Sequence, residues 1–102
     1  MPVICLLLAG LSWEVDAFSE EDLKKLKATG NCVQCDLSGA DLWSEDLSGA
    51  DLTQANLTKT SLKRVNLTDA NLTGTNLTDA NLIRAIFCGT TMQDGTMDNS
   101  GC

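Results

Sequence analysis

The chain of 102 residues contains no histidine and no tyrosine. Without histidine it lacks the commonest general base, the usual imidazole metal ligand and every Ser-His or Cys-His catalytic pair. Its formal net charge is −7 and it has no continuous stripe of basic residues, so nucleic-acid binding is not expected. No cofactor motif occurs either. We therefore expect a non-enzymatic protein with no cofactor and no metal site.

Long apolar runs are missing too. The apolar stretch at residues 3–13 is too short to cross a bilayer as a helix. The sequence Val15-Asp16-Ala17 follows it and offers small residues at the two positions that a signal peptidase recognises. We interpret residues 1–17 as a signal peptide and expect an exported protein, although no lysine or arginine precedes the apolar stretch. The alternative is a buried N-terminal strand.

Residues 18–31 are predicted to form a short helix. Ser19 is a favourable N-cap, Asp22 occupies the capping-box position, and Gly30 is a suitable stop. A helix of this length is marginal by itself and needs a surface to pack on. Since a repetitive segment follows at residues 32–102, we expect the helix to cap the N-terminal end of that segment.

The repetitive segment has an apolar residue at every fifth position. In an α-helix, residues five apart are rotated by about 140° and form no apolar face, and in a straight strand they alternate between the two sides. Only a chain that turns a corner every five residues points all of them inward, and four corners close a square coil of 20 residues. The series is Leu37, Leu42, Leu47, Leu52, Leu57, Leu62, Leu67, Leu72, Leu77, Leu82, Phe87, Met92 and Met97.

The position two residues before each of these must also point inward. It holds mainly alanine, threonine or valine, as a crowded interior requires. The exception is Glu45, which we expect to reach the open end and meet a lysine of the capping helix rather than to act in catalysis. We therefore predict an all-β fold, a quadrilateral β-helix of about three and a half coils with a short N-terminal capping helix.

The repeated pattern Ala-(Asp/Asn)-Leu-x-x in DLSGADLTQANL and NLTDANLTGTNLTDANL resembles the pentapeptide-repeat family over residues 36 to about 97. The flanks LKATGNCVQCDLSGADL and FCGTTMQDGTMDNSGC are similar to the ends of exported cyanobacterial and thylakoid-lumen members. This resemblance implies a right-handed quadrilateral β-helix, a location in the thylakoid lumen or periplasm, and no assigned enzymatic activity.

Removal of the signal peptide takes Cys5 with it and leaves an even number of cysteines, Cys32, Cys35, Cys88 and Cys102. Cys88 and Cys102 bracket the last coil and its tail, and Cys32 and Cys35 lie where the helix meets the first strand. We expect them to form structural disulfides rather than a zinc site, because the two pairs belong to opposite ends of the predicted solenoid. A thiol redox role for Cys32 and Cys35 is an alternative. It is weakened because the helix precedes the pair instead of following it.

Residues 20 apart should stack in columns on the four outer faces. One column contains Trp43, Lys63 and Ile83, and the adjoining corner contains Arg64 and Arg84. Every basic residue of the repeat lies on or beside this face, so we predict a contact patch for a protein partner. The alternative is ordinary surface variation, in which long basic side chains cover apolar neighbours.

We expect a non-catalytic exported protein that serves as a structural or protein-binding module for an unknown partner. It should be a monomer that does not bind a membrane after removal of the signal peptide. One alternative, suggested by the family resemblance, is a mimic of duplex DNA that binds gyrase, but the leader, the few coils and the cysteine-containing tail disfavour it. The other alternative is the thiol redox protein using Cys32 and Cys35.

Overall fold

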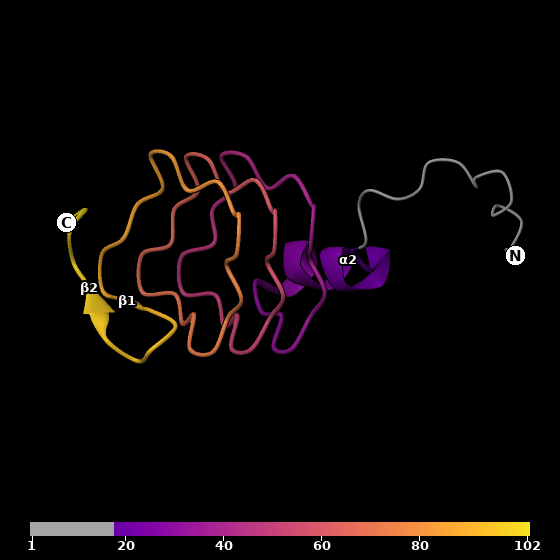
Figure 1. Ribbon diagram of the computed structural model, residues 1–102, viewed down its shortest axis with the longest axis horizontal. Coiled ribbons are helices and arrows are strands. Elements are labelled where there is room, and N and C mark those ends of the chain that lie inside the picture. The colour runs from indigo at the N-terminus through magenta and orange to yellow at the C-terminus, as the bar shows by residue number, and fades with distance from the viewer. Residues whose placement is uncertain (1–17) are drawn as a thin grey trace, which may run out of the picture.

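The computed structural model describes residues 18–102, which form one helix followed by a coiled, strand-like chain (Figure 1). Helix α2 spans Glu20–Thr29, strand β1 spans Thr90–Thr91, and strand β2 spans Met97–Asp98. The predicted signal peptide, residues 1–17, lies outside the described residues. Within the described part of the chain, no helix has the length and apolar character needed to span a membrane.

Helix α2 begins and ends at its capping residues. The Oγ of Ser19 accepts a hydrogen bond from the N–H of Asp22 at 3.2 Å. Gly30 has a φ of 81°, which a residue without a Cβ adopts at little cost, and its N–H donates to the carbonyl of Leu26 at 2.7 Å. The side chain of Leu26 is buried and that of Leu23 is partly buried against the first coil. The helix therefore covers the N-terminal end of the solenoid (Figure 1).

Parallel pairing between residues that lie 20 positions apart holds the coils together. Bridges occur at every fifth residue, from the pair Asn31↔Asp51 to the pair Asn71↔Thr91. Between them the central apolar residues donate their N–H groups to the next coil, as Leu57 donates to the carbonyl of Asn76 at 2.8 Å. One coil therefore takes 20 residues, as the five-residue period predicts.

A left-handed backbone conformation marks each corner. Positive φ angles recur at every fifth residue from position 34 to position 89 without a break. Most of these corners are not glycine, and the left-handed conformation costs such residues about 1–2 kcal/mol each. None of the corner residues is β-branched, the type for which this conformation is most strained. The corner residues are Gln34, Gly39, Ser44, Gly49, Gln54, Lys59, Arg64, Asp69, Gly74, Asp79, Arg84 and Gly89.

The interior consists of the leucine columns with small side chains between them. Leu42, Leu57 and Leu62 have no solvent exposure. Threonines in the second inward position also satisfy buried carbonyl groups, since Thr60 donates its hydroxyl to the carbonyl of Leu37 at 2.7 Å. Thr75 and Thr90 make the same bond to Leu52 and Leu67. The inward positions therefore combine close packing with hydrogen bonding.

The C-terminal tail departs from the predicted coil. The five-residue series places Met97 inside, but its side chain is 61% exposed, so the prediction is wrong at this residue. Strand β2 instead folds back and pairs antiparallel with β1, with Thr90 opposite Asp98. Gly101 then donates its N–H to the carbonyl of Phe87 at 2.7 Å. Because no further coil follows in the described chain, an inward position at 97 has no interior to enter.

Candidate functional site

The four outer faces are named here by the column of central residues behind each. On every face the residue before the central one is usually Asp or Asn, the residue after it points outward, and the next is the corner. Face 1 lies over Leu37, Leu57 and Leu77; face 2 over Leu42, Leu62 and Leu82; face 3 over Leu47, Leu67 and Phe87; and face 4 over Cys32, Leu52, Leu72 and Met92.

On faces 1, 3 and 4 most of the outward polar groups bond to one another. A Ser or Thr follows the central leucine, and its hydroxyl donates to the Asp or Asn two residues earlier, as Thr58 donates to Asn56 at 2.6 Å. The same oxygen of Asn56 accepts the backbone N–H of Thr58 at 3.1 Å. Each Oδ1 atom of this ladder therefore already accepts two hydrogen bonds and has little capacity left for a partner. The hydroxyl donors are Ser38, Ser48, Thr53, Thr58, Thr68, Thr73 and Thr78.

Face 2 has no hydroxyl at this position in any of its repeats. Trp43, Lys63 and Ile83 stand where the other faces have mostly Ser or Thr. Asp41 and Asn81 consequently accept the backbone N–H groups of Trp43 and Ile83 without a side-chain donor. Trp43 is 55% exposed and Ile83 is 61% exposed. Face 2 therefore presents apolar surface in place of the hydroxyl ladder.

Positive charge gathers at the corner beside face 2. Arg64 and Arg84 occupy the same corner one coil apart, and the N–H of Arg64 donates to the carbonyl of Ile83 at 3.0 Å. Lys63 precedes Arg64 on face 2. In residues 18–102 the only ion pair joins α2 to the first coil, so no carboxylate pairs with these three cations. The 20-residue pairing therefore places the five predicted patch residues on one side of the solenoid, where three of them are cationic on a chain with a net charge of −7.

That single ion pair of the described chain involves Glu45. Its Oε2 lies 3.6 Å from the Nζ of Lys27 on helix α2, so the expectation that it meets a lysine of the capping helix is confirmed. Both side chains are about half exposed, and solvent screening limits such a pair to about 0–1 kcal/mol. Glu45 thus contributes a weak contact of the cap.

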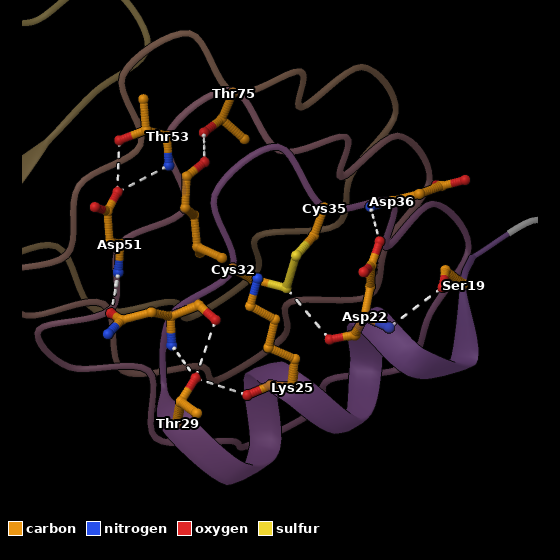
Figure 2. The surroundings of a disulfide bond; sticks show 12 residues. Ser19, Asp22, Lys25, Thr29, Cys32, Cys35, Asp36, Asp51, Thr53 and Thr75 are labelled. Carbon is orange, nitrogen blue, oxygen red and sulfur yellow. Dashed lines mark hydrogen bonds between the residues drawn. A yellow bond between two sulfur atoms is a disulfide. The ribbon is translucent and has the colours of Figure 1, made fainter.

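The junction between α2 and the first coil differs from the predicted capping box. The Oδ2 of Asp22 does not reach back to Ser19 but accepts the N–H of Asp36 at 2.8 Å (Figure 2). The N–H of Ser19 donates to the carbonyl of Asp36 at 2.9 Å. The first coil has no preceding coil to pair with Asp36, and the helix supplies both partners instead. Asp22 therefore closes the end of the sheet as well as belonging to the first turn of the helix.

Two disulfides lie at opposite ends of the solenoid. They join Cys32 to Cys35 and Cys88 to Cys102, the pairs expected from the sequence. The Sγ of Cys32 lies 3.2 Å from the carbonyl oxygen of Asp22 under helix α2 (Figure 2), a packing contact because a disulfide sulfur carries no hydrogen. Cys32 is 0% and Cys35 3% exposed. Because thiol exchange requires an accessible sulfur, this burial gives the redox alternative no support.

A shallow hollow of about 240 Å³ lies beside α2. It is lined by Phe18, Glu20, Leu23, Lys24 and Lys27. The charged lining residues, Glu20, Lys24 and Lys27, are all exposed, and none of the lining residues is a buried polar one. In residues 18–102 no cluster of three or more cysteine and acidic side chains could hold a metal ion. The hollow therefore offers no catalytic arrangement.

Three aspartates outside the core have lowered pKa values. The pKa of Asp46 is lowered by hydrogen bonds from the hydroxyl and then the N–H of Ser48. The hydroxyl and N–H of Thr96 lower the pKa of Asp94 in the same way. The N–H of Ser100, followed by its hydroxyl, lowers the pKa of Asp98. Each ionised carboxylate therefore stabilises the fold at pH values above its ordinary pKa of 3.8. This contribution is lost as the pH falls through the lower pKa of the folded state.

We expect the midpoint of thermal unfolding to fall as the pH is lowered below about 4, and to fall less in the triple variant D46N/D94N/D98N. Asparagine keeps an acceptor oxygen, as Asn56 and Asn66 do in the equivalent position, but does not titrate. Circular dichroism melts of both proteins at about pH 7 and about pH 3 measure the difference. An equal fall in the variant would contradict the assignment of the acid sensitivity to these carboxylates.

Parallel coils of 20 residues, a corner at every fifth residue and a leucine-lined interior define a β-solenoid of five-residue repeats. The sequence profile of the family described as "Pentapeptide repeats (8 copies)" matches residues 31–69 and 66–100. The chain belongs to the pentapeptide-repeat family, and its fold is a right-handed β-helix.

Solved structures of other members resemble the chain. HetL, a pentapeptide repeat protein involved in heterocyst differentiation regulation from the cyanobacterium Nostoc sp. strain PCC 7120, is 30% identical with a TM-score of 0.58, over 67% of this chain and 40% of HetL. Rfr23 from the cyanobacterium Cyanothece 51142 is 38% identical with a TM-score of 0.40, over 54% of this chain and 41% of Rfr23. A pentapeptide repeat protein of the Arabidopsis thaliana thylakoid lumen is 27% identical with a TM-score of 0.40, over 68% of this chain and 51% of that protein.

This chain therefore spans about half or less of the length of each of these relatives. A comparison with functionally curated protein sequences gives no match.

Proposed function

We propose that the protein is a non-catalytic binding module that contacts a partner protein through face 2 and the corner beside it. The contact patch consists of Trp43, Lys63, Arg64, Ile83 and Arg84. The observation that carries the proposal is the absence of the hydroxyl ladder from every repeat of face 2, while the other faces keep it in most of theirs. The repeat tolerates Ser or Thr at these positions, so the fold itself does not require exposed apolar side chains there.

The patch has the composition of a protein interface. Tryptophan and arginine dominate the binding energy of many interfaces, and the apolar groups here are flanked by cations that no carboxylate of residues 18–102 pairs with. A complementary partner surface would offer carboxylates around an apolar centre. The module would act as a monomer of about three and a half coils.

We further propose that the module works in an oxidising compartment, the thylakoid lumen or the periplasm. Two disulfides in so short a chain are typical of exported proteins, because cytosolic thiols are kept reduced. The apolar stretch at residues 3–13 supports export as a signal peptide.

The duplex-DNA mimic has less support than the protein-binding module. Such a mimic needs negative charge repeated along its axis, as in a nucleic-acid backbone. In the position before the central residue, Asp36 forms a β-bridge with Asn56 and Asp46 with Asn66. Negative charge therefore does not continue from one coil to the next in these columns. The charged residues of the contact patch, Lys63, Arg64 and Arg84, are also positive. No observation favours this function over the binding module.

Photo-crosslinking tests the proposed face. A benzoylphenylalanine at position 83 on face 2 should form a discrete covalent adduct in the native compartment, and the same residue at position 78 should not. Ile83 and Thr78 are a matched pair, because both are exposed and follow the central leucine in the same coil on adjacent faces. Adducts from position 78 alone, equal adducts from both positions, or none from either would contradict the proposal.

A further inference from the structure

The last coil leaves a row of backbone groups open below faces 1 and 2. In the coil before it, Leu62 and Arg64 donate their N–H groups to Asn81 and Ile83 at 2.8 and 3.0 Å. The corresponding N–H groups one coil later, those of Leu82 and Arg84, have no hydrogen-bond acceptor among residues 18–102. The N–H groups of Leu77 and Asp79 likewise have no acceptor among these residues. The carbonyls of Thr75, Ala80 and Ala85 receive no hydrogen bond from any donor among them.

The tail covers the other half of this end. Gly101 pairs with the carbonyl of Phe87, and the N–H of Gly89 donates to the Oδ1 of Asn99 at 2.7 Å. The disulfide from Cys102 to Cys88 fixes the tail to face 3. Figure 1 shows the tail and strands β1 and β2 at the end of the solenoid opposite α2. The open row at residues 75–85 is therefore an edge left beside a covered half.

The floor of the open edge is apolar and its rim is basic. Leu82 and Ala85 are only partly buried, whereas Leu62 and Val65, which occupy the same positions one coil earlier, have no exposure. At one corner Asp79 lies beneath Lys59, so the charges there balance. The next corner carries Arg64 and Arg84 without a carboxylate partner in the described chain.

We propose that residues 80–85 bind an extended, acidic segment of a partner protein as an added β-strand. The N–H groups of Leu82 and Arg84 and the carbonyls of Ala80 and Ala85 are unpaired among residues 18–102. An extended peptide supplies the complementary groups for the same pairing that each inner coil makes with its neighbour. A straight strand can follow only one side of the square. Because the unpaired arginines lie beside face 2, we expect the strand to bind at the edge below face 2 and not at the edge below face 1. An Asp or Glu at the end of the segment meets the guanidinium groups of Arg84 and Arg64.

A second copy of this chain fits the edge poorly. The tail adds a layer of backbone below faces 3 and 4, so two such ends cannot meet flat across residues 80–85. The proposal rests on the proposed function, because it names the chemistry of the partner that contacts face 2. It adds the main-chain pairing, which the side-chain patch alone does not predict.

The test begins with selection of binders from a random displayed peptide library on the oxidised chain. The enriched sequences are expected to be rich in Asp and Glu beside β-branched residues. One enriched peptide is then added to ¹⁵N-labelled protein, and amide hydrogen exchange is followed by NMR. The N–H groups of Leu82 and Arg84 should exchange at least about tenfold more slowly with saturating peptide, while those of Leu77 and Asp79 keep their rates.

Charge variants provide the matched control. Arg84→Glu should weaken the peptide by about tenfold or more, whereas Lys25→Glu, the same charge change on exposed α2, should leave the affinity unchanged. Enrichment of peptides without acidic residues, or of none, would overturn the proposal. Protection of all four edge amides that rises with protein concentration would show a second copy instead.

Binding of the peptide without protection of Leu82 and Arg84 would also refute strand addition. That result would leave the proposed contact on face 2 intact, whereas failed crosslinking from position 83 would remove it. The two failures are thus distinguishable.

Discussion

Replacement of Leu62 by alanine is expected to lower the free energy of unfolding by about 3–5 kcal/mol. Leu62 has no solvent exposure and lies behind face 2 with a coil on either side, so the shortened side chain leaves a cavity that the two coils cannot close. The whole free energy of unfolding of a small domain is about 5–15 kcal/mol, so this one substitution would remove a large part of the stability. Urea unfolding followed by circular dichroism, with the disulfides intact, measures the loss.

The matched control is Leu82→Ala in the same column. Leu82 is only partly buried because no coil covers it in the described chain, so its loss should be roughly 1–2 kcal/mol. Equal losses at the two positions would mean that the end of the solenoid is covered in solution. A loss at Leu62 below that at Leu82 would contradict the coil order described above.

Removal of the Cys88–Cys102 disulfide should cost about 3 kcal/mol, since the bond closes a loop with a sequence separation of 14. The tail that it holds is largely exposed, with only the Gly101–Phe87 and Gly89–Asn99 bonds and the β1–β2 pairing fixing it to the coil. The double variant C88S/C102S should therefore release the tail, and the N–H of Gly101 should exchange rapidly while that of Leu57 stays protected.

The control for this prediction is the intact mass of the native protein under non-reducing conditions. Two disulfides make the chain four hydrogens lighter than its reduced form and leave no cysteine of residues 18–102 for alkylation. Unchanged stability and unchanged exchange at Gly101 in the double variant would show that the disulfide does not fix the tail. Free thiols in the native protein would contradict the proposed oxidising compartment.

The solenoid could be predicted from the sequence because its rule is local and periodic. An apolar residue at every fifth position, small residues two positions earlier and Gly30 after a capped segment predict the coil and the helix without long-range information. The patch on face 2 followed from the same arithmetic, since a 20-residue coil places Trp43, Lys63 and Ile83 in one column.

The two ends could not be predicted in the same way. The repeat continues in sequence to Met97, but whether a residue is inside depends on a following coil, and the tail folds back at the turn containing Gly95 instead. The pairing of Asp22 with Asp36 likewise depends on which groups the first coil leaves open. The open edge at residues 80–85 is invisible in the sequence for the same reason, because it is defined by the absence of a neighbour.

The corner at every fifth residue restricts how such a chain can change its length during evolution. Loss or gain of one repeat keeps every leucine inside and costs little in packing, yet it rotates all later residues by a quarter turn. If the change falls between residues 64 and 83, Ile83 and Arg84 move away from the side that holds Trp43, Lys63 and Arg64, and the patch is divided between two sides of the square. Only a whole coil of 20 residues can be duplicated without moving the patch, so the interior accepts changes in steps of five while the surface accepts them in steps of 20.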